Sequence, residues 1–269
     1  MPATNIPTSA LVTGGADGLG KAICRRLIQL GVQHVAVLDV DRAKGQALSE
    51  GHPEVNFTPF DLAAFTESDL ETAASGISPF DTVICNAGIS ACGNFKDTPS
   101  ETEENVFEVN LLGHMRLVKA LLRRRWIEKG GRLAFTISAS VFTPFPLAVA
   151  YAASKAGLDG FANALEPYLI PEKISISRIY PGTMRTAHQQ KYYAEMDPST
   201  GSDPNQVAKK VVAGILKRKR HIYPDKMAKA FRAFSKIAPW AMPSLSHKAT
   251  RKYGDILYPE TPGKGDPAP

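Results

Sequence analysis

The sequence has few cysteines and no long apolar run. Only three of its 269 residues are cysteine, namely Cys24, Cys85 and Cys92. This odd, small number without paired spacing argues against a disulfide framework and against a zinc site, so we expect no bound metal. It also fits a reducing, cytoplasmic compartment. No stretch approaches about 18 apolar residues, and the residues up to Ser9 lack the regions of a signal peptide, so we expect neither a membrane-spanning helix nor a leader.

Acidic residues are almost missing from the C-terminal part of the chain. Residues 209–252 contain 13 Lys or Arg and one acid, Asp225, a net charge of +12, whereas the remainder has a net charge of −6. Arguments from charge therefore apply to this segment alone. Nucleic acid is a poor fit as a partner, because the basic residues are not interleaved with a recognised binding motif and the body is acidic.

Short apolar runs alternate with longer helical patterns. The runs lack strict polar alternation, as is typical of strands buried on both faces. They are Ala10–Thr13, His34–Asp39, Val55–Asp61, Asp81–Asn86, Arg132–Ser138, Ile174–Tyr180 and His221–Tyr223. Amphipathic stretches between them, including Val106–Leu122 and Tyr151–Leu169, predict helices. The β-α-β order predicts an α/β fold with a single doubly wound, Rossmann-type parallel sheet and helices on both faces.

The pattern of the chain divides it into three segments. Residues 1–224 form the sheet domain, in which Asp203-Pro204 predicts the start of a helix that ends near Arg218. Residues 225–258 form a basic amphipathic C-terminal extension, and we expect the Pro/Gly-rich residues 259–269 to be a disordered tail.

A glycine-rich turn follows the first predicted strand. The segment from Thr13 to Gly20 spaces its glycines G-x3-G-x-G and leads into a helix, whose free N–H groups and dipole favour a pyrophosphate. Asp39 ends the second strand, 19 residues after Gly20. A carboxylate at about this distance binds ribose hydroxyls and repels a 2′-phosphate, so Asp39 and Asp17 favour NAD(H) over NADP(H). Lys21 and Arg42 are nearby cations that weaken this preference.

Tyr151 and Lys155 stand four residues apart, on one face of a predicted helix. A cation near a phenol stabilises the phenolate and lowers its pKa, which makes a tyrosine usable as an acid or base near neutral pH. The pair alone is unspecific, because a solvated lysine on an amphipathic helix gives the same pattern. Ser138 lies at the end of a predicted strand, 13 residues before Tyr151. Asn110 lies inside a predicted helix, although asparagine has a low helix propensity, so its presence there indicates another role.

Together these pieces resemble the short-chain dehydrogenase/reductase family. The matching motifs occur in the family's order over about residues 8–224. They are Thr13–Gly20, Asp61-Leu62, Asn86-Ala87-Gly88, Asn110, Ser138, Tyr151-x3-Lys155 and Pro181-Gly182-x3-Thr186.

The resemblance implies a role for each matched residue. Tyr151 would exchange the proton with the substrate oxygen, Lys155 would bind the nicotinamide ribose and lower the pKa of Tyr151, and Ser138 would orient the carbonyl. Asn110 would hold a water that links Lys155 to solvent. The cofactor-binding residues would be Gly14, Asp17, Gly18, Leu19, Gly20, Asp39, Asp61, Leu62, Asn86, Ala87, Gly88, Tyr151, Lys155, Pro181, Gly182, Thr183, Met184 and Thr186.

The sequence departs from the family pattern at two places. Cys85 precedes Asn86 where the family usually has asparagine, and Ile137 precedes Ser138 where it usually has serine. Neither change removes a catalytic group. The resemblance also implies a homodimer or homotetramer, paired through the two long helices. Phe161 and Leu165 would serve that interface or face their own sheet.

Two interpretations of the C-terminal extension stay open. In residues 224–238 the apolar Met227, Ala230, Phe231, Phe234 and Ala238 follow a helical period, and the sequence places Lys229, Arg232 and Lys236 on the opposite face. With Trp240 this pattern fits peripheral contact with an anionic membrane surface. It also fits a helix that packs on its own domain beside the substrate pocket, which is the interpretation we favour slightly.

The favoured function is an NAD(H)-dependent oxidoreductase acting on a hydrophobic alcohol or ketone, such as a steroid, a long-chain compound or a 3-keto lipid. The expected pocket residues are Phe142, Phe145, Leu147, Tyr192, Tyr193 and Met196. The alternatives are an NADPH-dependent ketoreductase of lipid synthesis and a non-catalytic, membrane-associated nucleotide-binding protein.

Overall fold

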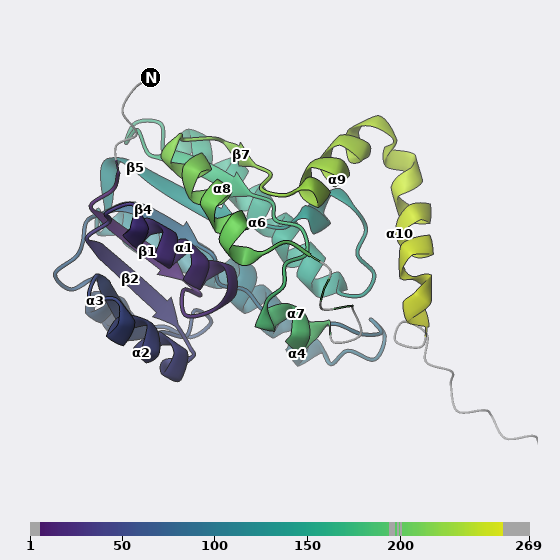
Figure 1. Ribbon diagram of the computed structural model, residues 1–269, viewed down its shortest axis with the longest axis horizontal. Coiled ribbons are helices and arrows are strands. Elements are labelled where there is room, and N and C mark those ends of the chain that lie inside the picture. The colour runs from purple at the N-terminus through teal and green to yellow at the C-terminus, as the bar shows by residue number, and fades with distance from the viewer. Residues whose placement is uncertain (1–5, 194–196, 198, 200, 255–269) are drawn as a thin grey trace, which may run out of the picture.

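A seven-stranded, all-parallel sheet forms the centre of the protein (Figure 1). The computed structural model describes residues 6–193, 197, 199 and 201–254. The strands lie in the order β3-β2-β1-β4-β5-β6-β7. Their bounds are β1 Ser9–Thr13, β2 His34–Asp39, β3 Val55–Pro59, β4 Phe80–Cys85, β5 Ile127–Thr136, β6 Ser175–Ile179 and β7 His221–Ile222. The predicted doubly wound sheet is confirmed, and its strand order reverses between β1 and β4, where such sheets bind ligands.

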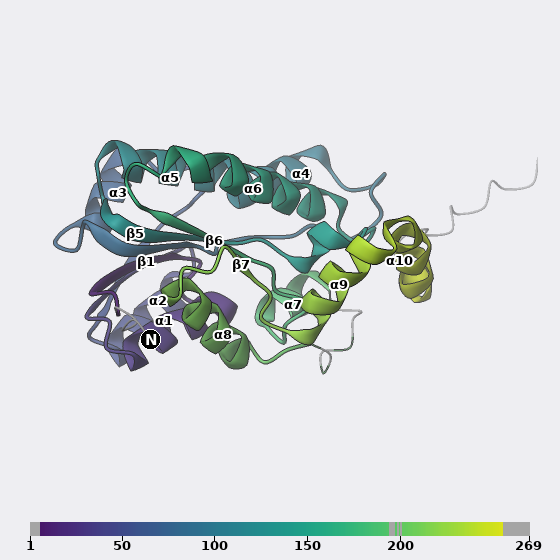
Figure 2. The same ribbon diagram turned by 90° about the horizontal axis from the view of Figure 1, so that it is seen from above.

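Helices cover both faces of the sheet (Figure 2). One face carries α1 (Gly18–Gln29), α2 (Arg42–Gly51) and α8 (Pro204–Leu216). The other carries α3 (Glu67–Ala74), α4 (Ser100–Phe107), α5 (Gly113–Arg123) and α6 (Val149–Tyr168). Successive residues of β1 serve both layers, because Val12 joins the apolar cluster of α1 and α8 whereas Leu11 joins that of α5 and α6. Strands covered in this way read as apolar runs, which is why the sequence located them.

The predicted helix at Val106–Leu122 is divided in the structure. The α4 helix ends at Phe107, a π-helical turn spans Glu108–Leu112, and α5 begins at Gly113. Such a turn adds a residue and rotates the helix beyond it. Gly113 lies so close to the backbone oxygen of Leu62 that a β-carbon there would overlap it. The turn therefore lets the helix pass this loop and places Asn110 inside the protein.

Helix boundaries elsewhere differ slightly from the predictions. The α8 helix starts at Pro204 with Asp203 as its cap, as the sequence indicates, but it ends at Leu216. Arg218, where the predicted helix ends, has a positive φ of 52° and cannot continue it.

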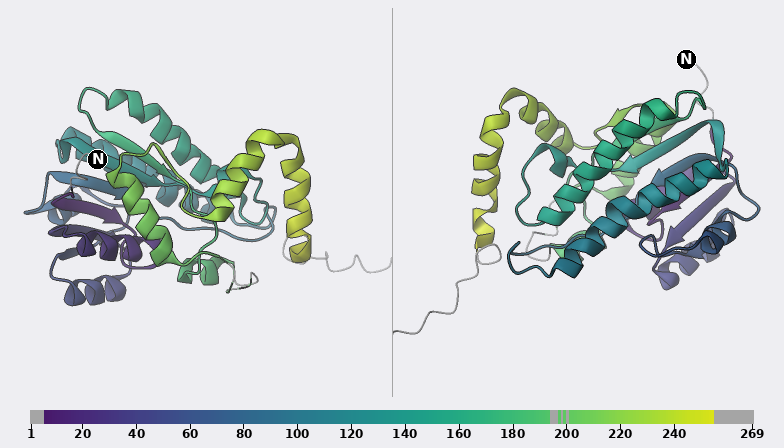
Figure 3. Two further views of the ribbon diagram at one scale, coloured as in Figure 1. Left: turned by 45° about the horizontal axis from the view of Figure 1, so that its top comes forward. Right: turned by 180° about the vertical axis from the view of Figure 1, so that it is seen from behind.

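The C-terminal extension forms an arm at the carboxyl end of the sheet (Figures 1 and 3). It consists of α9 (Lys226–Ile237), a 3-10 turn (Pro239–Ala241), α10 (Met242–Thr250) and a second 3-10 turn (Arg251–Tyr253). The amphipathic helix predicted here is confirmed, but the predicted facing of Arg232 is wrong, since its guanidinium lies over the ring of Phe142 in the body. The division at residue 224 stays a prediction, and the predicted disordered tail lies outside the described residues.

Among the described residues, no helix is both long enough and apolar enough to cross a membrane.

Candidate active site

A cavity of about 490 Å³ opens at the carboxyl ends of the strands, where β1, β4 and β5 meet. It brings together most of the residues singled out in the sequence. Those lining it are Gly14, Asp17, Gly18, Leu19, Asp39, Asp61, Leu62, Asn86, Ala87, Gly88, Ser138, Tyr151, Lys155, Pro181, Gly182, Met184 and Thr186. Three others are placed differently: Thr183 lines a smaller neighbouring cavity, while Gly20 and Asn110 lie behind the wall.

The glycine-rich turn is packed against the end of β4. Gly14 has a positive φ of 63°, and a β-carbon there would lie 2.8 Å from the α-carbon of Ala87. Gly20 packs against the backbone oxygen of Gly14, where a β-carbon would overlap it. Gly20 therefore shapes the turn and leaves the lining to Gly14, Gly18 and Leu19. Asp17 caps α1 by accepting a hydrogen bond from Gly18 N.

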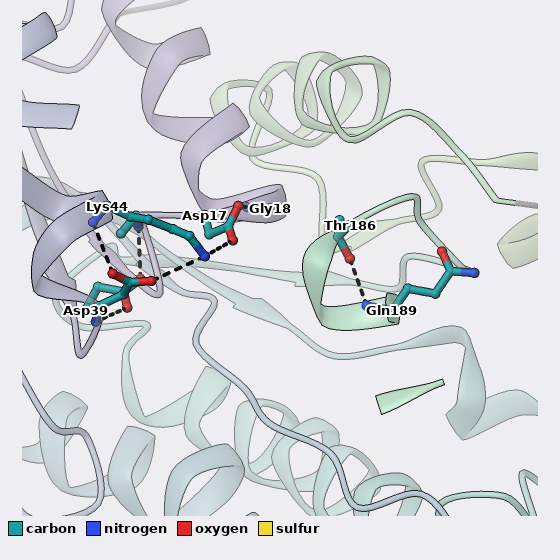
Figure 4. A network of polar contacts seen from close by, with 8 residues as sticks. Asp17, Gly18, Asp39, Lys44, Thr186 and Gln189 are labelled. Atoms are coloured by element: carbon teal, nitrogen blue, oxygen red, sulfur yellow. Dashed lines mark hydrogen bonds and ion pairs between the residues drawn. The ribbon is translucent and has the colours of Figure 1, made fainter. Parts of the chain in front are cut away.

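An acidic cluster surrounds one lysine at the β2 end of this cavity (Figure 4). Asp39 accepts hydrogen bonds from Ala16 N at 2.9 Å and from Asp41 N at 3.0 Å. Lys44 lies 2.8 Å from Asp17 and 3.2 Å from Asp41. Burial opposes ionisation of Asp17, but its hydrogen bonds to Lys44 and Gly18 N hold its pKa below the usual value. The ammonium of Lys21 also acts on Asp17, so three carboxylates stand against two ammonium groups and the cluster keeps a negative charge.

Sequence reasoning named Lys21 and Arg42 as the nearby cations and missed Lys44. Its ammonium lines the cavity because α2, which Asp41 caps, turns this residue toward the glycine loop. The Asp41 cap and the helix it begins were the only signal that could have found it.

Ser138, Tyr151 and Lys155 meet in the wall of the cavity. Lys155 is 3% exposed and donates to the backbone oxygen of Thr136 at 2.9 Å, with its ammonium 5.8 Å from the centre of the Tyr151 ring. Burial lowers the pKa of Lys155 to about 8. Burial raises the pKa of Tyr151, and a hydrogen bond with Ser138 opposes that rise. The lowering of the Tyr151 pKa by Lys155 stays a prediction.

Ser140 supports Ser138 through its main chain. Its backbone N–H donates to Ser138 Oγ at 3.1 Å, in a 3-10 turn (Ala139–Phe142) that Ser138 caps. This contact orients the Ser138 hydroxyl from the main chain.

Asn110 is fully buried and clamps the wall of the cavity together. Its Oδ1 accepts from Ile89 N at 2.8 Å, and its Nδ2 donates to Ile89 O and to Ser154 Oγ. It therefore fixes the segment after Gly88 to α6. The water relay predicted for Asn110 stays a prediction.

His114 is a buried residue that the sequence analysis did not single out. Its Nδ1 lies 3.2 Å from the backbone oxygen of Asn110, which can only accept, so Nδ1 carries the proton. Burial lowers its pKa to about 3, so the ring is neutral and Nε2 accepts from Thr13 Oγ1 at 3.2 Å. Thr13 Oγ1 in turn accepts from Asn86 N and Ala87 N. The ring thus joins the π-helical turn to β1 and β4.

A second cavity of about 140 Å³ adjoins the first beside Ser138 and Tyr151. Its apolar lining includes Phe145, Tyr193 and, from α9, Met227 and Phe231. Two side chains of α9 therefore contribute to the wall of this cavity, and a role for the extension as a cover of the substrate pocket stays a prediction.

The other residues predicted for the pocket fall elsewhere. Tyr192 lines the larger cavity. Phe142 packs against Tyr180 and Tyr223, Leu147 is buried, and neither lines the larger or the smaller cavity. Met196 lies outside the described residues.

His188, on α7 (Ala187–Tyr192), lines both cavities and was also missed. Its ring centre is 6.4 Å from that of Tyr151 and 4.8 Å from that of Tyr192. Burial lowers its pKa to about 4. Thr186 caps α7 through Gln189 N (Figure 4) and faces Gly18, so this helix closes the cavity opposite the glycine turn.

Comparison with known proteins assigns the chain to a family. A sequence model described as short chain dehydrogenase matches residues 8–197. The chain belongs to the short-chain dehydrogenase/reductase family. It is thus an oxidoreductase by class. An uncharacterised short-chain type dehydrogenase/reductase of Sinorhizobium fredii is 31% identical over 180 residues, covering 66% of this chain and 70% of that protein.

Two solved structures share the fold of this short-chain dehydrogenase/reductase. A Burkholderia phymatum member in complex with NAD superposes with a TM-score of 0.74, at 19% identity, over 88% of this chain and 95% of that one. A Burkholderia cenocepacia member in complex with NADP has the same TM-score, at 20% identity, over 89% and 97%. The two departures from the family pattern, Cys85 and Ile137, are both buried in the core.

The neutral His114 predicts a pH-dependent stability. Its folded pKa, about 3, lies below its ordinary 6.5, so its contribution is present above about pH 6.5 and is lost as the pH falls toward 3. We expect His114→Gln to flatten the acid loss of unfolding free energy, by at most about 5 kcal/mol. Urea unfolding at several pH values measures this. His34→Gln, exposed on β2, is the control and should follow the wild type. A gap between wild type and His114→Gln that is equal at every pH would contradict the buried neutral ring.

Proposed function

We propose that this short-chain dehydrogenase/reductase is an NAD(H)-dependent oxidoreductase that transfers a hydride to or from the carbonyl or alcohol carbon of a hydrophobic substrate. One observation carries the proposal: Ser138, Tyr151 and Lys155 line the same cavity as the glycine-rich turn and Asp39. A proton-exchanging group and a nucleotide cradle are the two parts that such a reaction needs in one place.

The residues present fit a nicotinamide dinucleotide. The close packing of Gly14 on Ala87 brings main chain to the cavity surface, and α1 begins there with its free N–H groups. Asp39 stands at the end of β2, where a carboxylate meets ribose hydroxyls. When bound, the nicotinamide ring supplies or accepts the hydride. The net negative charge of Asp17, Asp39, Asp41 and Lys44 supports NAD(H) as the form used, because a 2′-phosphate would be repelled.

The proton would move at Tyr151. In the reducing direction its phenol donates the proton to the substrate oxygen, and in the oxidising direction it takes the proton back. Its raised pKa keeps the phenol protonated and ready to donate. The Ser138 hydroxyl forms a hydrogen bond with the phenol and would bind the substrate oxygen, so it would orient the two groups toward each other. Lys155 places a positive charge behind the phenol and presents its ammonium toward the cavity.

The smaller cavity supports a hydrophobic substrate. It adjoins Tyr151, and aromatic and thioether side chains supply much of its lining, namely Phe145, Tyr193, Met227 and Phe231. Burying an apolar substrate surface there is favourable by roughly 25 cal/mol per Å². A steroid, a long-chain ketone or alcohol, or a 3-keto lipid fits this description.

An NADPH-dependent ketoreductase is the second candidate, and Lys44 favours it. Its ammonium belongs to a residue that lines the same cavity as Asp39, the carboxylate near which a 2′-phosphate would lie. Two carboxylates, Asp17 and Asp41, already hold it, so we rank this function second. A non-catalytic nucleotide-binding protein is disfavoured by the convergence of Ser138, Tyr151 and Lys155.

We further propose a cytoplasmic homodimer or homotetramer that pairs through α4, α5 and α6. Leu112 in the π-helical turn and Met115 on α5 are exposed apolar side chains, which supports it. Phe161, by contrast, packs edge-on against Phe135 of its own sheet at 5.7 Å.

The proposed role of Tyr151 as proton donor predicts the effect of removing its hydroxyl group. Tyr151→Phe should lower kcat by roughly a thousand-fold, because general acid catalysis is lost, while the affinity for NADH stays within about two-fold. Turnover of a panel of apolar ketones and alcohols, with NADH binding by fluorescence, measures both. Tyr168→Phe, 73% exposed at the far end of the same helix, is the matched control. Unchanged turnover in Tyr151→Phe would overturn the assigned role.

The acidic cluster predicts cofactor preference. Asp39→Asn should raise the affinity for NADPH relative to NADH by roughly ten-fold, since one repulsive charge near the 2′-phosphate is removed. Fluorescence titration of each variant with both dinucleotides measures the ratio. Lys44→Ala separates the candidates: it should leave NADH binding nearly unchanged. A wild type that prefers NADPH and loses that preference with Lys44→Ala would put the ketoreductase first.

The pKa of Lys155, about 8, predicts a pH profile for ketone reduction. Below this pH the Lys155 ammonium is charged and stabilises the phenolate that forms when Tyr151 gives up its proton. Above this pH the charge is lost. We expect kcat/KM to fall by up to ten-fold for each pH unit above about 8, since kcat/KM reports groups of the free enzyme. Initial rates from about pH 6 to pH 10 measure it. A profile that stays flat across this range would show that the charge of Lys155 is not required.

A further inference from the structure

The helix α9 is held to the body by only part of its surface. Ala228 is fully buried, and Phe231 reaches the smaller cavity. Arg232 donates to Tyr223 Oη at 3.2 Å and lies over the ring of Phe142. These residues define the inner face, so the opposite face of α9 is turned away from the sheet, as Figure 3 shows for the arm as a whole.

The outer face of α9 is apolar. Ala230, Ala233, Phe234 and Ile237 are all exposed, and they follow the spacing i, i+3, i+4, i+7 that aligns side chains on one side of a helix. Ile237 is 80% exposed, and Trp240, which follows in the 3-10 turn, is 82% exposed. We call these five residues the outer stripe. Scattered apolar residues on a surface are ordinary, but an aligned and continuous stripe indicates a contact site.

Cations border the outer stripe on α9. Lys226, Lys229 and Lys236 are exposed on α9. The single acid among the described residues from 225 to 253 is Asp225, which is 5% exposed and accepts hydrogen bonds from Gly182 N and Ala228 N. Its charge is held inside the protein, so the surface around the stripe is positive. This arrangement is typical of a helix that lies on an anionic bilayer. The lysines can meet the anionic headgroups, and the apolar face with its tryptophan can meet the boundary of the acyl chains.

We propose that the outer stripe docks the protein on the surface of an anionic lipid bilayer. Phe234, Ile237 and Trp240 enter the boundary between headgroups and acyl chains, and the lysines remain among the lipid phosphates. Met227 extends the stripe by one turn and also lines the smaller cavity, so the rim of that cavity meets the lipid. The docking surface stands independently of the proposed reaction, because its test needs no turnover.

Sedimentation of the full-length protein with vesicles tests the proposal. We expect binding to phosphatidylcholine vesicles that contain phosphatidylglycerol, weak binding to phosphatidylcholine alone, and loss of binding at high salt. The emission of Trp240 should shift to shorter wavelength on binding. Equal, negligible binding to both vesicle types would overturn the proposal.

Variants of exposed residues locate the contact without disturbing the core. Ile237→Asp should weaken vesicle binding by at least about ten-fold, since a buried isoleucine contributes roughly 1.5 kcal/mol or more. Ile170→Asp is the matched control, because Ile170 is 69% exposed at the opposite end of the sheet. Lys229→Glu and Lys236→Glu should each weaken binding by about five-fold or more.

The alternative partner for the outer stripe is a second copy of this chain. Light scattering without lipid, on wild type and Ile237→Asp, decides this. A wild-type oligomer that Ile237→Asp dissociates, with vesicle binding unaltered by the same variant, would overturn the lipid proposal. An oligomeric state that is the same in both proteins, together with the loss of vesicle binding, supports it.

Discussion

The hydroxyl of Thr13 is the contact on which the rest of the site depends. It accepts from the amides of Asn86 and Ala87 and donates to His114, which in turn donates to the carbonyl of Asn110. Three segments that are remote in sequence are fixed by it: the turn that begins α1, the end of β4, and the π-helical turn. Each supplies or supports one wall of the larger cavity. The hydroxyl has one proton and two acceptor sites, and all are used, so the geometry has little freedom.

This arrangement also sets the electrostatics behind Tyr151. Lys155 and His114 are both buried, and the positive charge of Lys155 adds to the effect of burial in lowering the pKa of His114. The fold therefore keeps one charge, on Lys155, and holds the imidazole neutral. The Lys155 ammonium loses its proton more readily than an ordinary lysine, since its pKa is about 8. Burial acts against the charged form of Tyr151, Lys155 and His114 alike, and it is the largest cause of each of their pKa shifts.

The fold and most of the cavity could be predicted because each leaves a local signal. Buried parallel strands are apolar runs, so all seven were found, although β5 begins at Ile127 and the polar Glu128 and Lys129 hid its first residues. The motif residues end strands, and strand ends meet at one edge of the sheet. His114 was missed because its partner Thr13 is 101 residues away in the sequence. Lys44 was missed although Asp41 is only three residues away, because Asp17, which brings its ammonium to the glycine-rich turn, is 27 residues away. The helical period of α9 likewise predicted an apolar side without deciding what lies against it.

The buried carboxylate of Asp225 gives the arm a mechanical role. One oxygen caps α9 through Ala228 N, and the other accepts from Gly182 N in the loop after β6. Gly182 lines both cavities, and a β-carbon there would lie 2.9 Å from Asp225 Oδ1. Any rotation of α9 must therefore pull on the floor of the active site or break this bond. The carboxylate thus ties the position of α9 to the loop that lines both cavities.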